Sequence, residues 1–138
     1  MRKSKPDSGQ PSTTRSKAPR LQGPPPTELT RPHQKLLSVL QDMGYVTVAE
    51  HPAGVYRLDV YLPELHAAVE YDGPGHGWKR DAVRDQWLWQ TFYLPVLRIR
   101  TTDEETLKGE LTSFFRYLEQ LGETRVRRQC ARENGWHG

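Results

Sequence analysis

Hydrophobic and polar positions change their period several times along residues 30–121, from helical to strand-like spacing and back. Residues 30–44 place apolar side chains at helical spacing, with Pro32 suited to the first turn and Gly44 to the end. Short apolar runs follow at 45–49, 55–61 and 67–73, and they predict three strands. Because the intervening turns are short, we expect an antiparallel meander.

The helical and strand-like periods alternate again after the third strand. The pattern predicts a helix over 78–92, a strand over 93–100 and a helix over 102–121, which begins near Asp103 with acids in its first turn. A strand–helix–strand unit favours a parallel pair of strands. The predicted order is therefore α-β-β-β-α-β-α, a mixed α+β sheet of the α/β type with helices on its faces.

Charge divides the chain of 138 residues into three parts. Residues 1–27 carry a net charge of +5, residues 28–121 carry −4, and residues 122–138 carry +2. The first part is rich in Ser, Pro and basic residues, so we expect a disordered tail. We expect one folded domain over 28–121 and a basic C-terminal tail over 122–138, in which Trp136 is disordered.

The basic charge of the two terminal segments indicates which partners the protein could bind. Such arms favour polyanions, of which nucleic acid is the usual one, although they could also be solubilising tails. The sequence contains no apolar run long enough for a membrane span. We therefore expect a cytoplasmic protein, nucleoid-associated when bound to DNA, and a homodimer or larger complex stays open.

Three acidic residues interrupt the apolar character of the predicted strands. Asp59 lies in the second strand, and Glu70 and Asp72 lie in the third, two residues apart and so on one face. Carboxylates in a sheet core are costly unless they are paired or bind a cation. If the two strands pair, these acids converge with His76, which predicts a site for a divalent cation such as Mg²⁺.

Each of these acids also has a structural interpretation. Asp59 could pair with Arg57 or Arg98, and the face shared by Glu70 and Asp72 could simply be solvated.

The remaining candidates have structural alternatives too. His76 could be a surface histidine, and Asp81 could be an acid favoured by the start of its helix. Arg98 and Arg100 share a strand face, so they could contact phosphate or pair with the acids.

Four segments, in order and at workable spacing, resemble the PD-(D/E)xK nuclease superfamily. Within it they are most similar to the endonucleases related to very-short-patch-repair enzymes. The segments are residues 58–60, 69–76, 80–85 and 95–99.

The resemblance implies a restriction-endonuclease-like fold and hydrolysis of phosphodiester bonds in DNA, of the nicking, repair or restriction type, with Mg²⁺ or Mn²⁺. It implies that Asp59, Glu70 and Asp72 hold the metal and that His76 relays a proton. Asp85, or Asp81 one turn earlier, would order His76 or a metal-bound water. The implied nucleic-acid contacts are Lys79, Arg80, Arg84, Arg98 and Arg100.

Two departures from the family pattern matter. Asp72 occupies the usual Lys position of the E-x-K motif, and the resembling subgroup also lacks that Lys. The subgroup often has a Glu on the first helix, and this chain has His33 or Gln34 at that position. Glu28 lies too early in the sequence to belong to the predicted helix.

Two other functions stay open. Residues 72–76 are also similar to the RAP domain, which would make the chain a non-catalytic DNA- or RNA-binding module on the same fold. The acidic core and basic arms would also suit a protein-interaction module.

Overall fold

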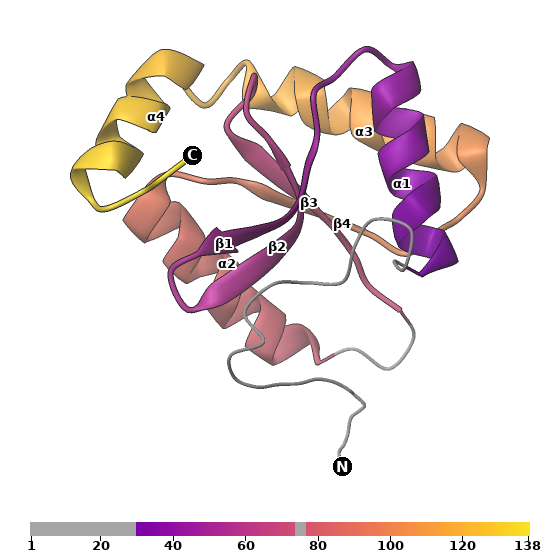
Figure 1. Ribbon diagram of the computed structural model, residues 1–138, viewed down its shortest axis with the longest axis horizontal. Coiled ribbons are helices and arrows are strands. Elements are labelled where there is room, and N and C mark those ends of the chain that lie inside the picture. The colour runs from indigo at the N-terminus through magenta and orange to yellow at the C-terminus, as the bar shows by residue number, and fades with distance from the viewer. Residues whose placement is uncertain (1–29, 74–76) are drawn as a thin grey trace.

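Four strands form one mixed sheet with helices on both faces (Figure 1). The computed structural model describes residues 30–73 and 77–138, so the predicted N-terminal tail and His76 lie outside the described residues. The elements in chain order are α1 (Arg31–Asp42), β1 (Val48–Ala53), β2 (Tyr56–Leu62), β3 (Ala67–Tyr71), α2 (Trp78–Phe92), β4 (Val96–Ile99), α3 (Glu104–Leu118) and α4 (Thr124–Glu133).

The pairing of the strands confirms the predicted topology. The sheet order is β1-β2-β3-β4, with β1–β2 and β2–β3 antiparallel and β3–β4 parallel. The start of α3 is also as predicted, because the Asp103 carboxylate accepts a hydrogen bond from the Thr106 backbone N–H at 2.9 Å. The first strand is displaced, since β1 begins at Val48 and runs on to Ala53, beyond the predicted 45–49.

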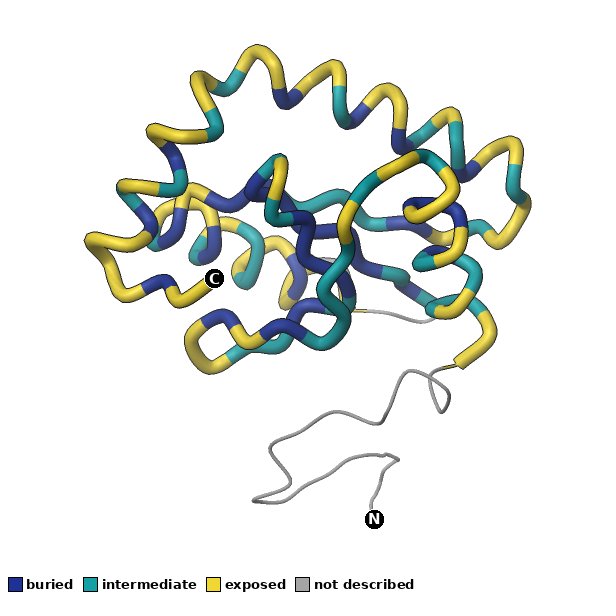
Figure 2. The backbone as a smooth tube through the Cα atoms, turned by 45° about the horizontal axis from the view of Figure 1, so that its top comes forward, coloured by how far each residue is buried: buried dark blue, intermediate teal, exposed yellow. Residues whose placement is uncertain are grey.

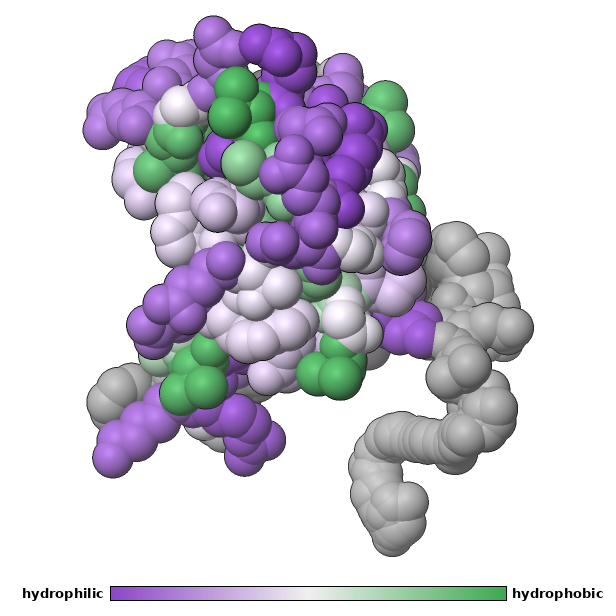
Figure 3. Space-filling view, turned by 90° about the vertical axis from the view of Figure 1, so that its left-hand side faces the viewer, coloured by the Kyte–Doolittle hydropathy of each residue, from purple (hydrophilic) through white to green (hydrophobic). Residues whose placement is uncertain are grey.

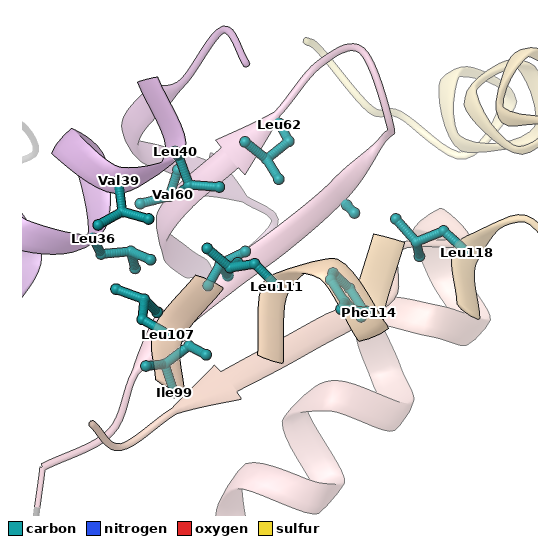
Figure 4. Close-up of a cluster of buried hydrophobic side chains, with 12 residues drawn as sticks. Leu36, Val39, Leu40, Val60, Leu62, Ile99, Leu107, Leu111, Phe114 and Leu118 are labelled. Carbon is teal, nitrogen blue, oxygen red and sulfur yellow. The ribbon is translucent and has the colours of Figure 1, made fainter. Parts of the chain in front are cut away.

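One hydrophobic core lies between the sheet and the helices α1 and α3. Figure 4 shows its side chains converging from both helices onto the strands, and Figure 2 shows that buried positions run along the strands. The core brings together residues far apart in sequence, which fixes α1 over β2 and β3. Its labelled members are Leu36, Val39, Leu40, Val60, Leu62, Ile99, Leu107, Leu111, Phe114 and Leu118.

A second core lies on the opposite face, beneath α2 and α4. Leu58, Tyr61 and Ala68 of the strands pack there with Leu88 of α2 and Ala131 of α4. At the nearby β1–β2 turn, Gly54 has φ of +64°, and an added Cβ would lie 2.5 Å from the Trp87 ring. Only glycine fits that close approach, which lets Trp87 pack under the hairpin as a core residue.

The C-terminal segment is part of the folded domain, so the prediction of a tail over 122–138 is wrong. It forms α4 and then buries Trp136, which is 4% exposed, against rings that include His51, Tyr61 and Phe92. The arginines of α4 suggested a solvated segment. Two of them, Arg125 and Arg132, are indeed exposed. Figure 3 shows that hydrophilic side chains cover much of this side of the molecule.

Arg127 explains why this basic helix can pack. Its guanidinium is buried and donates hydrogen bonds to the backbone carbonyls of Leu65 and His66, both at 2.8 Å, and of Tyr93 at 3.2 Å. Arg128 donates to the carbonyl of Pro63 in the same turn. The planar fork of arginine thus joins α4 to the β2–β3 turn and to the end of α2.

We expect Arg127→Lys to lower the free energy of unfolding by about 1–3 kcal/mol, because a lysine ammonium sits on a shorter side chain and lacks the two separate nitrogens with which the guanidinium reaches three carbonyls. Urea denaturation measures the loss. Arg125→Lys on the exposed side of α4 is the control and should change stability by less than about 0.5 kcal/mol. Equal effects of the two substitutions would contradict this role.

His66 is buried in the neutral form beneath Trp136. Its Nε2 lies 2.8 Å from the Phe92 carbonyl, which only accepts, so Nε2 carries the proton and Nδ1 accepts from the Tyr61 hydroxyl at 2.8 Å. Burial lowers the pKa of His66 to about 4. In the unfolded chain the ordinary pKa of about 6.5 applies, so the unfolded state gains a proton first as the pH falls.

We therefore expect His66 to make the protein less stable between pH 6.5 and pH 4. The matched variant is His66→Asn, because His66 has φ of +48° and asparagine tolerates that region. The stability advantage of the wild type over this variant should shrink by about 2 kcal/mol from pH 8 to pH 5. Urea denaturation at both pH values measures it, and an advantage independent of pH would contradict the buried neutral state.

Candidate active site

The candidate site lies where β2 and β3 separate. Their regular pairing ends at Val60 and Val69. One position further, the Asp59 backbone N–H donates to Glu70 Oε2 at 2.7 Å, and the Tyr71 backbone N–H donates to Asp59 Oδ2 at 2.8 Å. Each carboxylate thus accepts a hydrogen bond from a backbone N–H of the other strand. These bonds hold Asp59 and Glu70 at the point where the two strands diverge, which we call the β2–β3 fork.

The backbone of β2 is irregular at Asp59. Leu58 and Tyr61 both belong to the core under α2, although they are three residues apart, whereas Val60 belongs to the core under α1. Strict alternation would put residues three apart on opposite faces, so the strand slips phase between Leu58 and Val60. The slip turns the Asp59 side chain towards α1.

His33 of α1 meets Asp59 in this fork. Its Nε2 lies 3.2 Å from Asp59 Oδ2, and its Nδ1 lies 2.7 Å from the Thr30 hydroxyl. The hydrogen bond to Asp59 raises the pKa of His33, and burial opposes that effect only in part. His33, which the sequence analysis placed where the resembling subgroup often has a glutamate, is therefore in contact with Asp59.

Glu70 is the most buried acid of the fork, at 6% exposed. Its Oε1 accepts a hydrogen bond from Arg84 Nη1 of α2 at 2.9 Å, and Arg84 also donates to the Arg57 carbonyl at 3.0 Å. Burial, together with the nearby charge of Asp59, raises the pKa of Glu70 to about 7, although Arg84 opposes the shift. Arg84 is thus the counter-charge of Glu70, and its phosphate contact stays a prediction.

Asp72 shares the α2 face with Glu70, as predicted, but lies in a separate cluster around Arg98. Arg98 Nη1 is 2.9 Å from Asp72 and 3.6 Å from Asp81, and Arg98 Nη2 is 2.6 Å from Asp85. Burial alone would lower the pKa of Arg98, but Asp85 first, and then Asp72 and Asp81, outweigh burial and raise it.

The sequence analysis allowed Arg98 either to contact phosphate or to pair with the acids. The structure shows that it pairs with the acids. Asp81 and Asp85 also contact Arg98, so both have a structural partner beyond the start of their helix.

The other predicted nucleic-acid contacts lie on the surface. Lys79 and Arg80 are exposed on the first turn of α2, and Arg100 is exposed just after β4. In the part of the chain that the structure describes, no three His, Cys, Asp or Glu side chains already form a group that could hold a metal ion. Asp59 and Glu70 are the predicted ligands that the fold brings together.

One acid near the fork escaped the sequence analysis. Glu50 in β1 lies opposite Asp59, because Ala49 pairs with Val60 and His51 with Leu58 on either side. The predicted first strand ended at residue 49, so it did not include Glu50. Had the first strand been extended through Pro52, its antiparallel pairing with the Asp59 strand would have placed Glu50 beside Asp59.

Comparisons with known proteins add a limited likeness. No protein-family model matches the chain, and no curated protein matches it. Among solved structures, the catalytic domain of the homing endonuclease I-Bth0305I is similar, with 17% sequence identity and a TM-score of 0.48. The match covers 67% of this chain and 94% of that domain. A likeness at this level leaves the function to be argued from the residues of the site.

No helix in the described ranges is both long and apolar enough to cross a membrane.

We expect Arg84→Met to lower the free energy of unfolding by about 3 kcal/mol, because it leaves the buried Glu70 carboxylate without its counter-charge. Chemical denaturation measures the change. The second substitution Glu70→Gln, made in the Arg84→Met background, should recover most of the loss. Arg80→Met, on an exposed position of the same helix, is the control and should be nearly neutral. If the double variant is no more stable than Arg84→Met, the ion pair is not the cause.

Proposed function

We propose that the protein is a metal-dependent endonuclease that hydrolyses phosphodiester bonds in DNA. The observation that carries the proposal is the reciprocal placement of Asp59 and Glu70 in the β2–β3 fork, with His33 in contact with Asp59. The charge of Asp59 is near enough to raise the pKa of Glu70, and keeping two acids this near at low exposure is costly for a purely structural purpose. It is a common arrangement where a cation and a phosphate are to be bound.

The donor chemistry of the fork suits Mg²⁺ or Mn²⁺. Carboxylate oxygens are hard ligands, and Mg²⁺ is often held by one or two carboxylates, with water and substrate phosphates completing its shell. We assign Asp59 and Glu70 as the residues that would hold the cation. A cation bound there supplies polarisation of the phosphate and a lowered pKa of a bound water. Asp72, the third ligand predicted from sequence, instead contacts Arg98.

The residues around the fork have separate roles in this proposal. His33 holds a proton beside Asp59, and its raised pKa suits a group that donates that proton to a leaving oxygen. The exposed Lys79, Arg80 and Arg100 contact the phosphate backbone and position the polymer. The part assigned to His76 in the sequence analysis stays a prediction.

One observation favours a second candidate, a non-catalytic nucleic-acid-binding module. Glu70 and Asp72 both have arginine partners in the fold, namely Arg84 and Arg98. Acids paired in this way can serve stability alone. Such a module would bind DNA or RNA without metal and would keep its affinity when Asp59 is changed.

A cleavage assay separates the two candidates. We expect the purified protein to nick or cut supercoiled plasmid with Mg²⁺ or Mn²⁺ and to be inactive in EDTA. Asp59→Asn and Glu70→Gln should each lower the rate by at least about 100-fold, because the amides keep the backbone hydrogen bonds but lose the charge. Gel electrophoresis of the plasmid over time gives the rates.

The control is Glu105→Gln, on an exposed position of α3 far along the chain from the fork, which should cleave at the wild-type rate. Single-stranded DNA and structured RNA identify the preferred polymer. Metal-independent binding with no cleavage of any substrate, unchanged by Asp59→Asn, would reject the endonuclease in favour of the binding module.

A further inference from the structure

Val55, at the tip of the β1–β2 hairpin, does not follow the usual chemistry of such turns. Because Ala53 pairs with Tyr56, only two residues connect the strands. The first, Gly54, has φ of +64°, as a type II′ turn requires, and the second position usually carries a small polar residue. Val55 stands there instead and is 88% exposed. Local rules of this kind are broken most often at functional sites.

The tip of the hairpin is held against α2. An added Cβ on Gly54 would lie 2.5 Å from the Trp87 ring, and the Tyr56 ring packs edge-on against Trp87 with centroids 5.4 Å apart. Figure 1 shows the hairpin lying beside α2. Val55 therefore projects from a turn that is already fixed in place, so that binding a partner there costs little ordering of the backbone.

A second exposed valine extends the apolar surface around Trp87. Val83 of α2 is 66% exposed and lies one turn before Trp87, on the same side of the helix. Val55, Tyr56, Val83 and Trp87 thus lie around one place, which we call the hairpin patch. Single exposed apolar residues need no explanation, but a group of them indicates contact with a partner.

The charges beside the hairpin patch favour nucleic acid as that partner. Lys79 and Arg80 are exposed on the first turn of α2, next to the patch. The acids Asp81 and Asp85 lie on the other side of the helix, where they contact Arg98. An apolar surface flanked by cations matches a groove of a duplex, in which base edges lie between two rows of phosphates. A partner protein with an apolar surface would not need the cations.

Arg84 links the hairpin to the β2–β3 fork. Its Nη1 lies 2.9 Å from Glu70 Oε1, and its Nη2 donates to the Arg57 carbonyl at 3.0 Å. Val55 precedes Asp59 by four residues, which is about 13 Å along a strand, or about four base-pair steps of a duplex. A duplex with a phosphate at the fork would therefore present its bases to the tip of the hairpin.

We propose that the β1–β2 hairpin enters the major groove of duplex DNA, where Val55 makes apolar contact with the bases and Lys79 and Arg80 lie against the flanking phosphates. This inference deepens the proposed endonuclease function and rests on it for the identity of the ligand. The major groove admits a two-stranded β-ribbon, and the thymine methyl group is the apolar feature that it displays. Val55 would thus favour sites that contain A·T pairs.

The test measures binding of the full chain to a short A·T-rich duplex by fluorescence anisotropy in EDTA. Val55→Ser introduces a residue that the turn prefers, so the melting temperature should stay the same or rise. The variant should bind about 10-fold more weakly, because an apolar contact is lost. Val126→Ser, at an exposed position of α4, is the matched control and should bind as the wild type does.

Two further measurements separate the apolar contact from the ionic ones. Val55→Ser should keep the wild-type slope of log K against log salt concentration, since valine releases no counterions, whereas Arg80→Met should reduce that slope by about one. A duplex with uracil in place of thymine lacks the methyl groups. The wild type should bind it more weakly than the thymine duplex, and Val55→Ser should not distinguish the two.

The outcomes distinguish this inference from the proposed function. Wild-type affinity in Val55→Ser beside a weakened Arg80→Met would overturn the role of the hairpin, and equal affinity of the wild type for the thymine and uracil duplexes would do so whatever the stability of the variants. Either result leaves the endonuclease intact if plasmid is still cleaved. If the wild type binds the duplex as expected but cleaves no substrate, the endonuclease fails and the hairpin keeps its role.

Discussion

The arrangement of this protein depends on the neutralisation of acids that lie within a sheet. Glu70 and Asp72 point to the α2 face, where little water reaches them, and each has an arginine as counter-charge. Arg84 comes from α2 and Arg98 from β4, so satisfying the acids also fixes how the helix and the last strand lie against β3. Charge pairing and core packing therefore specify the same arrangement of α2 on the sheet.

Much of the fold could be predicted from the sequence because its local signals agree with the tertiary packing. The helical stripe of α1, the cap at Asp103 and the strand–helix–strand unit each indicated the element that forms. α4 could not be predicted in this way. Its four arginines suggest solvation. Its burial depends on groups from distant parts of the chain, namely the carbonyls that accept from Arg127 and the core around Ala131.

The residue types of the site could be predicted from the sequence, but which of the acids lie together could not. Period-two spacing correctly placed Glu70 and Asp72 on one face, and the proximity of Asp59 to Glu70 followed from pairing the two strands. The division of the acids between the fork and Arg98 depends on the phase slip at Asp59 and on side-chain lengths, which a pattern of apolar positions does not contain. Glu50 was missed for a related reason, because the predicted first strand ended at residue 49, one position before it.

Arg98 also constrains how the sequence can change over evolutionary time. Its guanidinium contacts three carboxylates, those of Asp72, Asp81 and Asp85, so its loss would remove a cation that all three share. The loss of one of the three acids would be far less severe, because two would still share the cation. Related sequences should therefore keep this arginine more strictly than any single one of its acids.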